Sequence, residues 1–226
     1  MKIAVVYVCP LDAGEQHVTY ALRFLQSYNA NPPASDHISV IALNGTRLSS
    51  EVECLFSCLP NLKFIEHDDS GWDIGAYQRA AKEVPCDLMV FLGGSTYFKR
   101  AGWLQRMALS FQHRGRAIYG CMGNRGDAKV NVQPHIRTTG FWMPPDLMNN
   151  YPLRCTENSQ RYGIEHGPEC LTTWVTRQGL KAWVVTWNGD YLWAQSDEIE
   201  NGFHRGNQSA LLVGDRLTEP PYYPVS

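Results

Sequence analysis

Apolar and polar positions alternate in blocks along the first hundred residues, and each block has the length of one strand or one helix. Continuous apolar runs rich in β-branched residues, bounded by Pro, Gly or Asn, predict buried strands. Apolar positions three and four residues apart predict amphipathic helices between these runs. The predicted strands are 2–9, 37–43, 61–65 and 86–92, and the predicted helices are 15–28, 49–59 and a third from residue 73 to the stop at Pro85.

A strand that alternates with a helix at this spacing predicts an α/β fold with a mostly parallel central sheet, right-handed crossovers and helices on both faces. The pattern is less regular after residue 100. Strands are predicted at 117–121, 137–143 and 181–187, and helices at 101–113, 146–150 and 169–178. The polar stretch 123–133 predicts a loop, and the segment after residue 190 is expected to wrap back over the fold.

Size and charge restrict the class of protein. At 226 residues the chain is most simply one domain, and its formal net charge of −2 gives no general attraction to nucleic acid. No apolar run approaches the roughly 20 residues of a membrane span, and the start lacks a signal-peptide pattern. The seven cysteines are odd in number and lack zinc spacing, so free thiols are expected. A cytoplasmic protein without a transmembrane segment is therefore expected.

Two loops follow two neighbouring predicted strands. The first is the polar stretch 67–71, and the second is the stretch 93–96, Gly-Gly-Ser-Thr. Parallel strands end at one edge of a sheet, where open α/β sheets bind ligands. Asp73 follows the first loop, where it is placed to cap a helix, and the glycines around it let a ligand approach the backbone closely. The sequence thus predicts one cleft lined by Asp73, Gly93, Gly94 and Ser95.

The stretch 71–77, Gly-Trp-Asp-Ile-Gly-Ala-Tyr, together with the strand that follows it, resembles the nucleotide-sugar half of GT-A type glycosyltransferases. More narrowly, it is similar to the rhamnan-synthesis-type branch, where such a segment precedes a strand that carries an Asp-x-Asp metal motif. In this chain that position holds Gly93, Gly94 and Ser95. Segments 137–142, 165–172 and 201–215 resemble later parts of the same branch. The resemblance therefore assigns 1–100 to the nucleotide-sugar half, and 101–226 to the acceptor half with its C-terminal tail.

The resemblance implies transfer of a hexose or deoxyhexose from a nucleotide-sugar donor to a glycan or lipid-linked acceptor, in polysaccharide biosynthesis. It also implies a Mg²⁺ or Mn²⁺ ion held by carboxylates, because hard cations prefer oxygen ligands and stabilise the diphosphate. A serine hydroxyl brings no charge, so the expectation of a metal is weakened. Three outcomes stay open: a metal held elsewhere, a metal-free site that uses cationic side chains, or an inactive protein.

Two glutamates compete for the role of general base. Glu169 is explained equally well as a first-turn helix residue stabilised by the helix dipole. Glu165 lies in the predicted loop before that helix, where its position has less structural explanation, so Glu165 is the preferred base. Trp72 and Trp142 lie in the motif segments and are candidates for stacking on sugar rings.

Donor binding draws on both halves of the chain. Guanidinium groups bind phosphate in a bidentate manner, which suits a site without a metal. His204 is explained about equally well as an exposed tail residue, and Asp68 as a solvated turn residue. The predicted donor-binding residues are Asp68, Asp73, Gly93, Gly94, Ser95, Arg137, His204 and Arg205.

Two rival functions come from other classes. A catalytically inactive module that binds a sugar nucleotide or a glycan with the same fold is favoured by the missing Asp-x-Asp. A Rossmann-type dinucleotide enzyme is disfavoured, because Cys9-Pro10-Leu11-Asp12 stands where Gly-x-Gly-x-x-Gly would follow the first strand. The sequence leaves open the sugar, the base, the acceptor and the stereochemical outcome.

Overall fold

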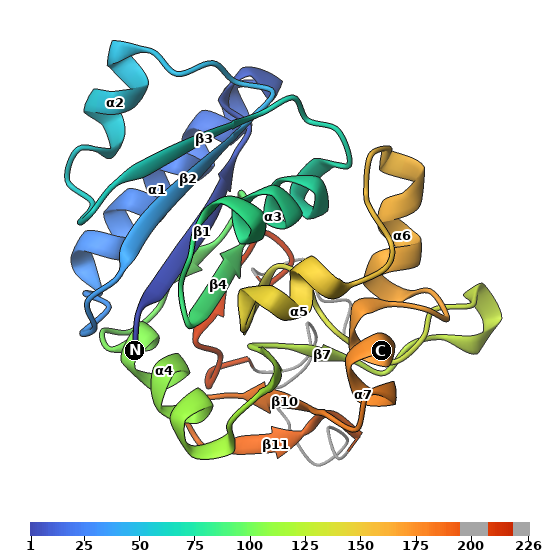
Figure 1. Ribbon diagram of the computed structural model, residues 1–226. Coiled ribbons are helices and arrows are strands. Elements are labelled where there is room, and N and C mark those ends of the chain that lie inside the picture. The colour runs from blue at the N-terminus through green and yellow to red at the C-terminus, as the bar shows by residue number, and fades with distance from the viewer. Residues whose placement is uncertain (195–207, 219–226) are drawn as a thin grey trace.

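One eight-stranded sheet runs through the computed structural model, which describes residues 1–194 and 208–218 (Figure 1). The strands lie in the order β11-β10-β6-β9-β4-β1-β2-β3. Strands β1 to β4 are parallel to one another, and β6 is parallel to β10. Strands β9 and β11 run antiparallel to their neighbours. The bounds are β1 Ile3–Cys9, β2 Ile38–Asn44, β3 Lys63–His67, β4 Leu88–Leu92, β6 Ala117–Gly120, β9 Gly140–Met143, β10 Lys181–Val185 and β11 Asp190–Leu192.

Helices cover both faces of the sheet, as predicted (Figure 1). Strand β1 is buried on both faces of the sheet: Val5 and Tyr7 pack on one face, and Ala4 and Val6 pack on the other. Burial on both faces accounts for its continuously apolar sequence. The first face is covered by α1 Glu15–Ala30, α2 Ser50–Phe56 and α4 Trp103–Arg114. The second is covered by α3 Trp72–Glu83, α5 Pro145–Asn150, α6 Asn158–His166 and α7 Leu171–Arg177.

The sheet is not parallel throughout, because β9 runs antiparallel between β4 and β6. The chain joins β6 to β9 without a crossover helix, and a parallel neighbour needs such a crossover. The predicted strand 137–143 is accordingly shorter and begins at Gly140, which lies opposite Leu92 at the end of β4. Residues 137–139 therefore lie at the carboxyl edge of the parallel strands.

The prediction that Glu165 lies in a loop was wrong, because residues 158–166 form helix α6. Helix α6 is polar on nearly all sides and buries only Ile164, so it has no apolar stripe to reveal it. Its start is marked instead by a capping box between Glu157 and Gln160. Glu165 lies in the last turn of this helix.

Two small ribbons complete the fold. Strand β5, Tyr97–Phe98, pairs antiparallel with β12, Val213–Gly214, and β7, Gly123–Asn124, pairs with β8, His135–Ile136. The first ribbon shows that residues 208–218 return over the fold. All seven cysteines are free, as expected. None of the helices in 1–194 or 208–218 combines the length and apolar character that crossing a membrane requires.

Candidate functional site

A cavity of about 460 Å³ opens at the carboxyl ends of the four parallel strands β1 to β4. One wall comes from the residues that end or follow these strands, and the other from residues 137–139, from α6 and from the segment after β12. The side chains and backbone that line it belong to Pro10, Ala13, Gln16, His17, Tyr20, Asn44, Asp69, Trp72, Asp73, Gly93, Gly94, Ser95, Arg137, Thr139, Arg161, Glu165, Asp215, Arg216 and Leu217.

A sharp turn leads from β3 into α3. Asp69, Gly71 and Trp72 have φ angles of 65°, 70° and 53°, all in the left-handed region. Gly71 also packs so closely that a Cβ atom would lie 2.1 Å from the carbonyl oxygen of Cys155. The predicted cap was wrong, because Gly71 holds the N-cap position and no side chain caps the helix. Asp73 is thereby free to face the cavity from the first turn of α3.

The carboxyl group of Asp73 lies beside the loop that ends β4. Its Oδ2 atom is 3.5 Å from the place where a Cβ atom of Gly93 would stand. Although the cavity gives Asp73 some contact with solvent, burial raises its pKa to about 6, and the negative charge of Glu165 adds to the rise. The positive charges of Arg161 and Arg216 oppose it. Asp73 therefore titrates close to neutral pH.

Glu165 faces the same cavity from α6. The hydroxyl of Thr138 donates a 2.5 Å hydrogen bond to its Oε1 atom, and Nε of Arg161 lies 3.6 Å from Oε2. These two contacts orient the carboxylate toward the cavity. Glu169 is placed differently: its carboxylate pairs with Arg177 at 2.5 Å on the surface, and it does not line the cavity.

The loop that follows β4 is fixed by hydrogen bonds from three directions. The N–H of Gly93 donates to the carbonyl of Thr139 at 3.3 Å, and the hydroxyl of Tyr7 donates to the carbonyl of Gly94 at 2.7 Å. The Oγ atom of Ser95 accepts a hydrogen bond from the backbone N–H of a residue beyond β12 at 3.3 Å. Gly93, Gly94 and Ser95 thus line one cavity with Asp73, where the strand order placed them.

The described residues do not fit a divalent metal held in the Asp-x-Asp manner. The position that the sequence resemblance predicts for that motif holds Ser95, whose hydroxyl is neutral. The Oδ1 atom of Asp69 accepts a hydrogen bond from Asn44, and Asp215 pairs with Arg137 at 3.5 Å. Within 1–194 and 208–218, no group of three or more His, Cys, Asp or Glu side chains is arranged to hold a metal ion. His204 and Arg205 lie outside the described residues.

Other candidates from the sequence are distributed between the core and the surface. Asp68 is bound to the backbone N–H and hydroxyl of Ser70 and does not line the cavity. Trp142 is fully buried and stacks on Tyr119, so it belongs to the core. Trp72 is 42% exposed and lines the cavity.

Arg161 and Arg216 line the cavity but were not among the site residues predicted from the sequence. Arg161 lies on the unpredicted helix α6, where its guanidinium stacks 4.5 Å from the ring centre of Trp72. Asp215 and Arg216 follow the apolar run 210–213 after a single glycine, Gly214. A charged pair at the end of an apolar run was a usable signal for Arg216, whereas Arg161 carried none.

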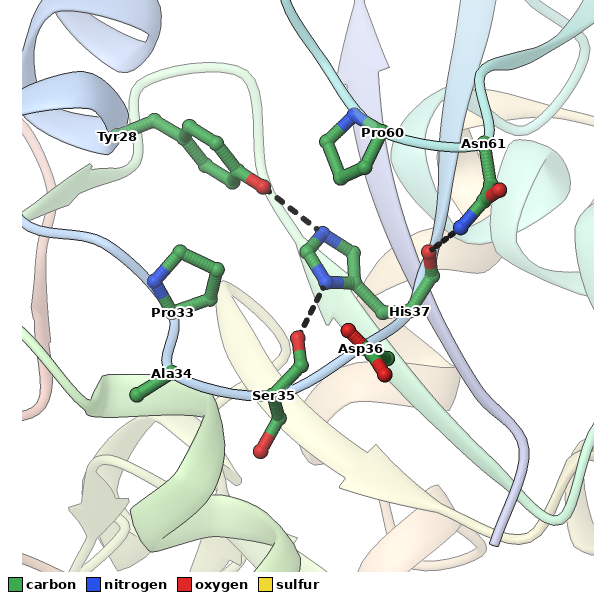
Figure 2. Close-up of a pocket in the computed structure, with 8 residues that line it drawn as sticks. All are labelled: Tyr28, Pro33, Ala34, Ser35, Asp36, His37, Pro60 and Asn61. Carbon is green, nitrogen blue, oxygen red and sulfur yellow. Dashed lines mark hydrogen bonds between the residues drawn. The ribbon is translucent and has the colours of Figure 1, made fainter.

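A larger cavity of about 530 Å³ lies at the opposite edge of the sheet, where β2 begins (Figure 2). Its central group is the buried ring of His37. The Nδ1–H group donates to the carbonyl of Ser35 at 2.9 Å, which leaves Nε2 to accept from the hydroxyl of Tyr28 at 3.1 Å. The amide of Asn61 donates to the carbonyl of His37 at 2.9 Å. Burial lowers the pKa of His37, so the ring stays neutral at pH 7 and serves as a structural link.

Comparison with known proteins gives the fold its class. No family model and no curated protein matches the chain. The mannosyltransferase PcManGT from Pyrobaculum calidifontis, solved with GDP-Man and Mn²⁺, matches with a TM-score of 0.50 and 10% identity over 73% of this chain and 53% of that one. S. aureus TarS 1–349 with UDP-GlcNAc matches with a TM-score of 0.48 and 12% identity over 73% and 54%. The chain has a GT-A-like fold.

This chain spans about half the length of those two structures. At 10% identity the likeness to PcManGT shows the GT-A-like fold and nothing of the donor or the acceptor. The narrower resemblance to the rhamnan-synthesis branch is not tested by these matches and stays a prediction.

Proposed function

We propose that this chain is a glycosyltransferase that moves a hexose or deoxyhexose from a nucleoside-diphosphate sugar to a hydroxyl group of a glycan or lipid-linked acceptor. One observation carries the proposal. In a GT-A-like fold, the cavity at the strand ends combines a glycine loop with carboxylates from two different helices, Asp73 of α3 and Glu165 of α6. Such an arrangement suits a ligand that brings both phosphate and sugar hydroxyl groups.

The donor would lie across the ends of β1 to β4. The missing side chains of Gly93 and Gly94 let phosphate or sugar oxygens approach the backbone closely. Asp73 stands beside Gly93, where its carboxyl oxygens can accept hydrogen bonds from hydroxyl groups of the sugar or the ribose. Its pKa near 6 leaves most of the group ionised above pH 7, as an acceptor requires.

The transfer step needs a group that takes a proton. In the inverting form of the reaction, the acceptor oxygen bonds to the anomeric carbon. The bond from that carbon to the diphosphate breaks, and its electron pair stays on the departing phosphate oxygen. The proton of the acceptor hydroxyl moves to Glu165, whose orientation by Thr138 and Arg161 suits a general base.

A matched pair of variants tests this role. Glu165→Gln should leave calorimetric donor affinity unchanged and lower the rate of transfer by about 10²–10⁴. Glu169→Gln makes the same chemical change on the nearby surface, outside the cavity, and should keep full activity. Unchanged turnover in Glu165→Gln would remove the proposed base and favour a retaining reaction.

A catalytically inactive module with the same fold is the second candidate, and the neutral end of β4 favours it. Thermal melting with UDP-, GDP- and dTDP-sugars, and with NAD as the comparison, measures ligand binding in either case. We expect a nucleotide sugar to raise the melting temperature and NAD to leave it unchanged. Donor binding without hydrolysis or transfer to any acceptor would favour the binding module over the enzyme.

A further inference from the structure

The segment after β12 crosses the end of β4. Pairing of Val213 with Phe98 and of Gly214 with Tyr97 holds the segment in register. The contact at Gly214 is tight, since a Cβ atom there would lie 2.3 Å from the Tyr97 ring. The pairing of β5 with β12 therefore fixes the residues after Gly214 at the cavity, beside the loop that contains Ser95.

Arg216 is the residue delivered to that loop. Its backbone N–H donates to the Oγ atom of Ser95 at 3.3 Å, and the residue lines the cavity. Ser95 belongs to the position where a GT-A enzyme with an Asp-x-Asp motif would present a carboxylate. The backbone of a cationic residue, Arg216, is therefore hydrogen-bonded to Ser95, which stands where the carboxylate of the motif would be expected.

The other two arginines in the lining already have anionic partners. Arg137 lies 3.5 Å from Oδ2 of Asp215, and both side chains are at least nine-tenths buried. Arg161 lies 3.6 Å from Glu165. Arg216 is an exposed residue of the cavity lining, and its guanidinium group has no ion-pair partner in the part of the chain that the structure describes. Its charge is therefore available to a ligand.

We propose that the guanidinium group of Arg216 binds the diphosphate of the donor at the end of β4 and neutralises the leaving group there in place of a divalent cation. This inference rests on the proposed function. A guanidinium group suits the task because it stays charged at every working pH and binds two phosphate oxygens at once. As the bond to the sugar breaks, the growing charge on the phosphate oxygen lies beside Arg216.

Asp73 does not oppose this use of the cavity strongly. The Asp73 carboxylate is close enough to Arg216 to be stabilised by the positive charge of the guanidinium group. The negative charges of a bound diphosphate would repel the same carboxylate. The positive charge of Arg216 therefore offsets part of the repulsion between the Asp73 carboxylate and a bound diphosphate.

Calorimetry with UDP, GDP and inorganic pyrophosphate, each in EDTA and in Mn²⁺, tests the inference on the full chain. We expect the wild-type affinity for UDP or GDP to be the same within about threefold in the two buffers. Arg216→Ala should weaken binding by about 10- to 100-fold, the usual range for a charged hydrogen bond. Arg216→Lys should recover only part of the loss, because an ammonium group cannot bind two oxygens in a fork.

Arg79→Ala is the matched control. Arg79 is an exposed arginine of α3 that pairs with Glu83 and does not line the cavity, so its loss should leave affinity unchanged. Binding that disappears in EDTA and returns with Mn²⁺, together with normal binding by Arg216→Ala, would overturn the inference while the proposed function stands. Binding of pyrophosphate that depends on Arg216, with no gain from UDP or GDP, would keep the anion site and overturn the proposed donor. No binding of any of the three probes would overturn both.

Discussion

The cavity at the start of β2 and the cavity at the ends of β1 to β4 differ in how far their polar groups satisfy one another. The larger one, at the start of β2, is built around His37, whose two ring nitrogens and carbonyl oxygen all have partners within the protein. The smaller one, at the ends of β1 to β4, holds Asp73 with a raised pKa and Arg216 without an ion-pair partner among the described residues. Their volumes, about 530 and 460 Å³, are similar and do not separate them. The incompletely paired charges favour the cavity at the ends of β1 to β4 as the ligand site, because a binding site needs polar groups that can interact with the ligand.

The largest expected effect concerns the stability cost of Asp73. Its folded pKa of about 6 exceeds the ordinary value of 3.8, so the folded state binds this proton more tightly than the unfolded state. The contribution of Asp73 to the free energy of unfolding therefore falls as the pH rises from about 4 to above 6, by up to about 3 kcal/mol. Asp73→Asn removes the titration and should stabilise the protein at pH 7.5 while it weakens donor binding.

Urea unfolding of both proteins at pH 4.5, 6.0 and 7.5 measures this effect. The advantage of Asp73→Asn should be small at pH 4.5 and largest at pH 7.5. An advantage that does not change with pH would show that the charge of Asp73 costs the fold nothing, and the contrast between the two cavities would lose its basis.

The next effect belongs to the other cavity. His37→Gln leaves the Tyr28 hydroxyl or the Ser35 carbonyl without a well-placed partner, and we expect a loss of about 1–2 kcal/mol in the free energy of unfolding at pH 7.5. Because burial lowers the pKa of His37 below 6.5, its contribution is present above pH 6.5 and is lost as the pH falls through the lowered pKa. The loss caused by the variant should therefore shrink at acid pH.

Donor affinity gives a second test of the cavity around His37. Calorimetry should give the same nucleotide affinity for His37→Gln and for the wild type, since His37 lies at the opposite edge of the sheet. A nucleotide affinity that depended on His37 would make the larger cavity part of the ligand site.

The smallest effect concerns Trp72. Its ring lies 4.5 Å from the Arg161 guanidinium, which in turn contacts Glu165, and an exposed contact of this kind contributes about 0.5–1 kcal/mol. Trp72→Ala should therefore lower the rate of transfer by about two- to fivefold, with donor affinity unchanged. The ring of Tyr162 also contacts the Arg161 guanidinium, at 4.9 Å, but Tyr162 does not line the cavity. Tyr162→Ala is the control. An equal loss of transfer rate in both variants would show that Trp72 acts only by positioning Arg161.

The first hundred residues were predictable because each strand there is buried on both faces and each helix has one apolar side. Those two patterns are visible without tertiary knowledge. They located β1 to β4, and with them the common edge where Gly93, Gly94 and Ser95 meet Asp73. What the pattern could not give was the direction of Asp73, which depends on three left-handed residues and on the close contact between Gly71 and Cys155.

The second half was harder because its elements are held by contacts that the local sequence does not encode. Helix α6 has one buried residue, and β12 has only two residues, which are held by the partner strand β5. These elements carry Glu165 and Arg161, and place Arg216. Glu165 was preferred as the general base because nothing structural explained a glutamate at its position in a predicted loop. It lies instead on a helix, oriented toward the cavity by Thr138.

The ribbon between β5 and β12 also sets an order of events during synthesis. Ser95 and Arg216 are 121 residues apart in the chain, so a growing chain can make the contact between them only long after β4 has been synthesised. However early β1 to β4 pair on the ribosome, the glycine loop stays without its arginine until residue 216 has left the exit tunnel. By the same logic, a protease that cuts just after Gly214 would remove the anion site and leave all eight strands of the sheet uncut. Binding of a diphosphate would then report whether a chain is intact, in addition to whether it is folded.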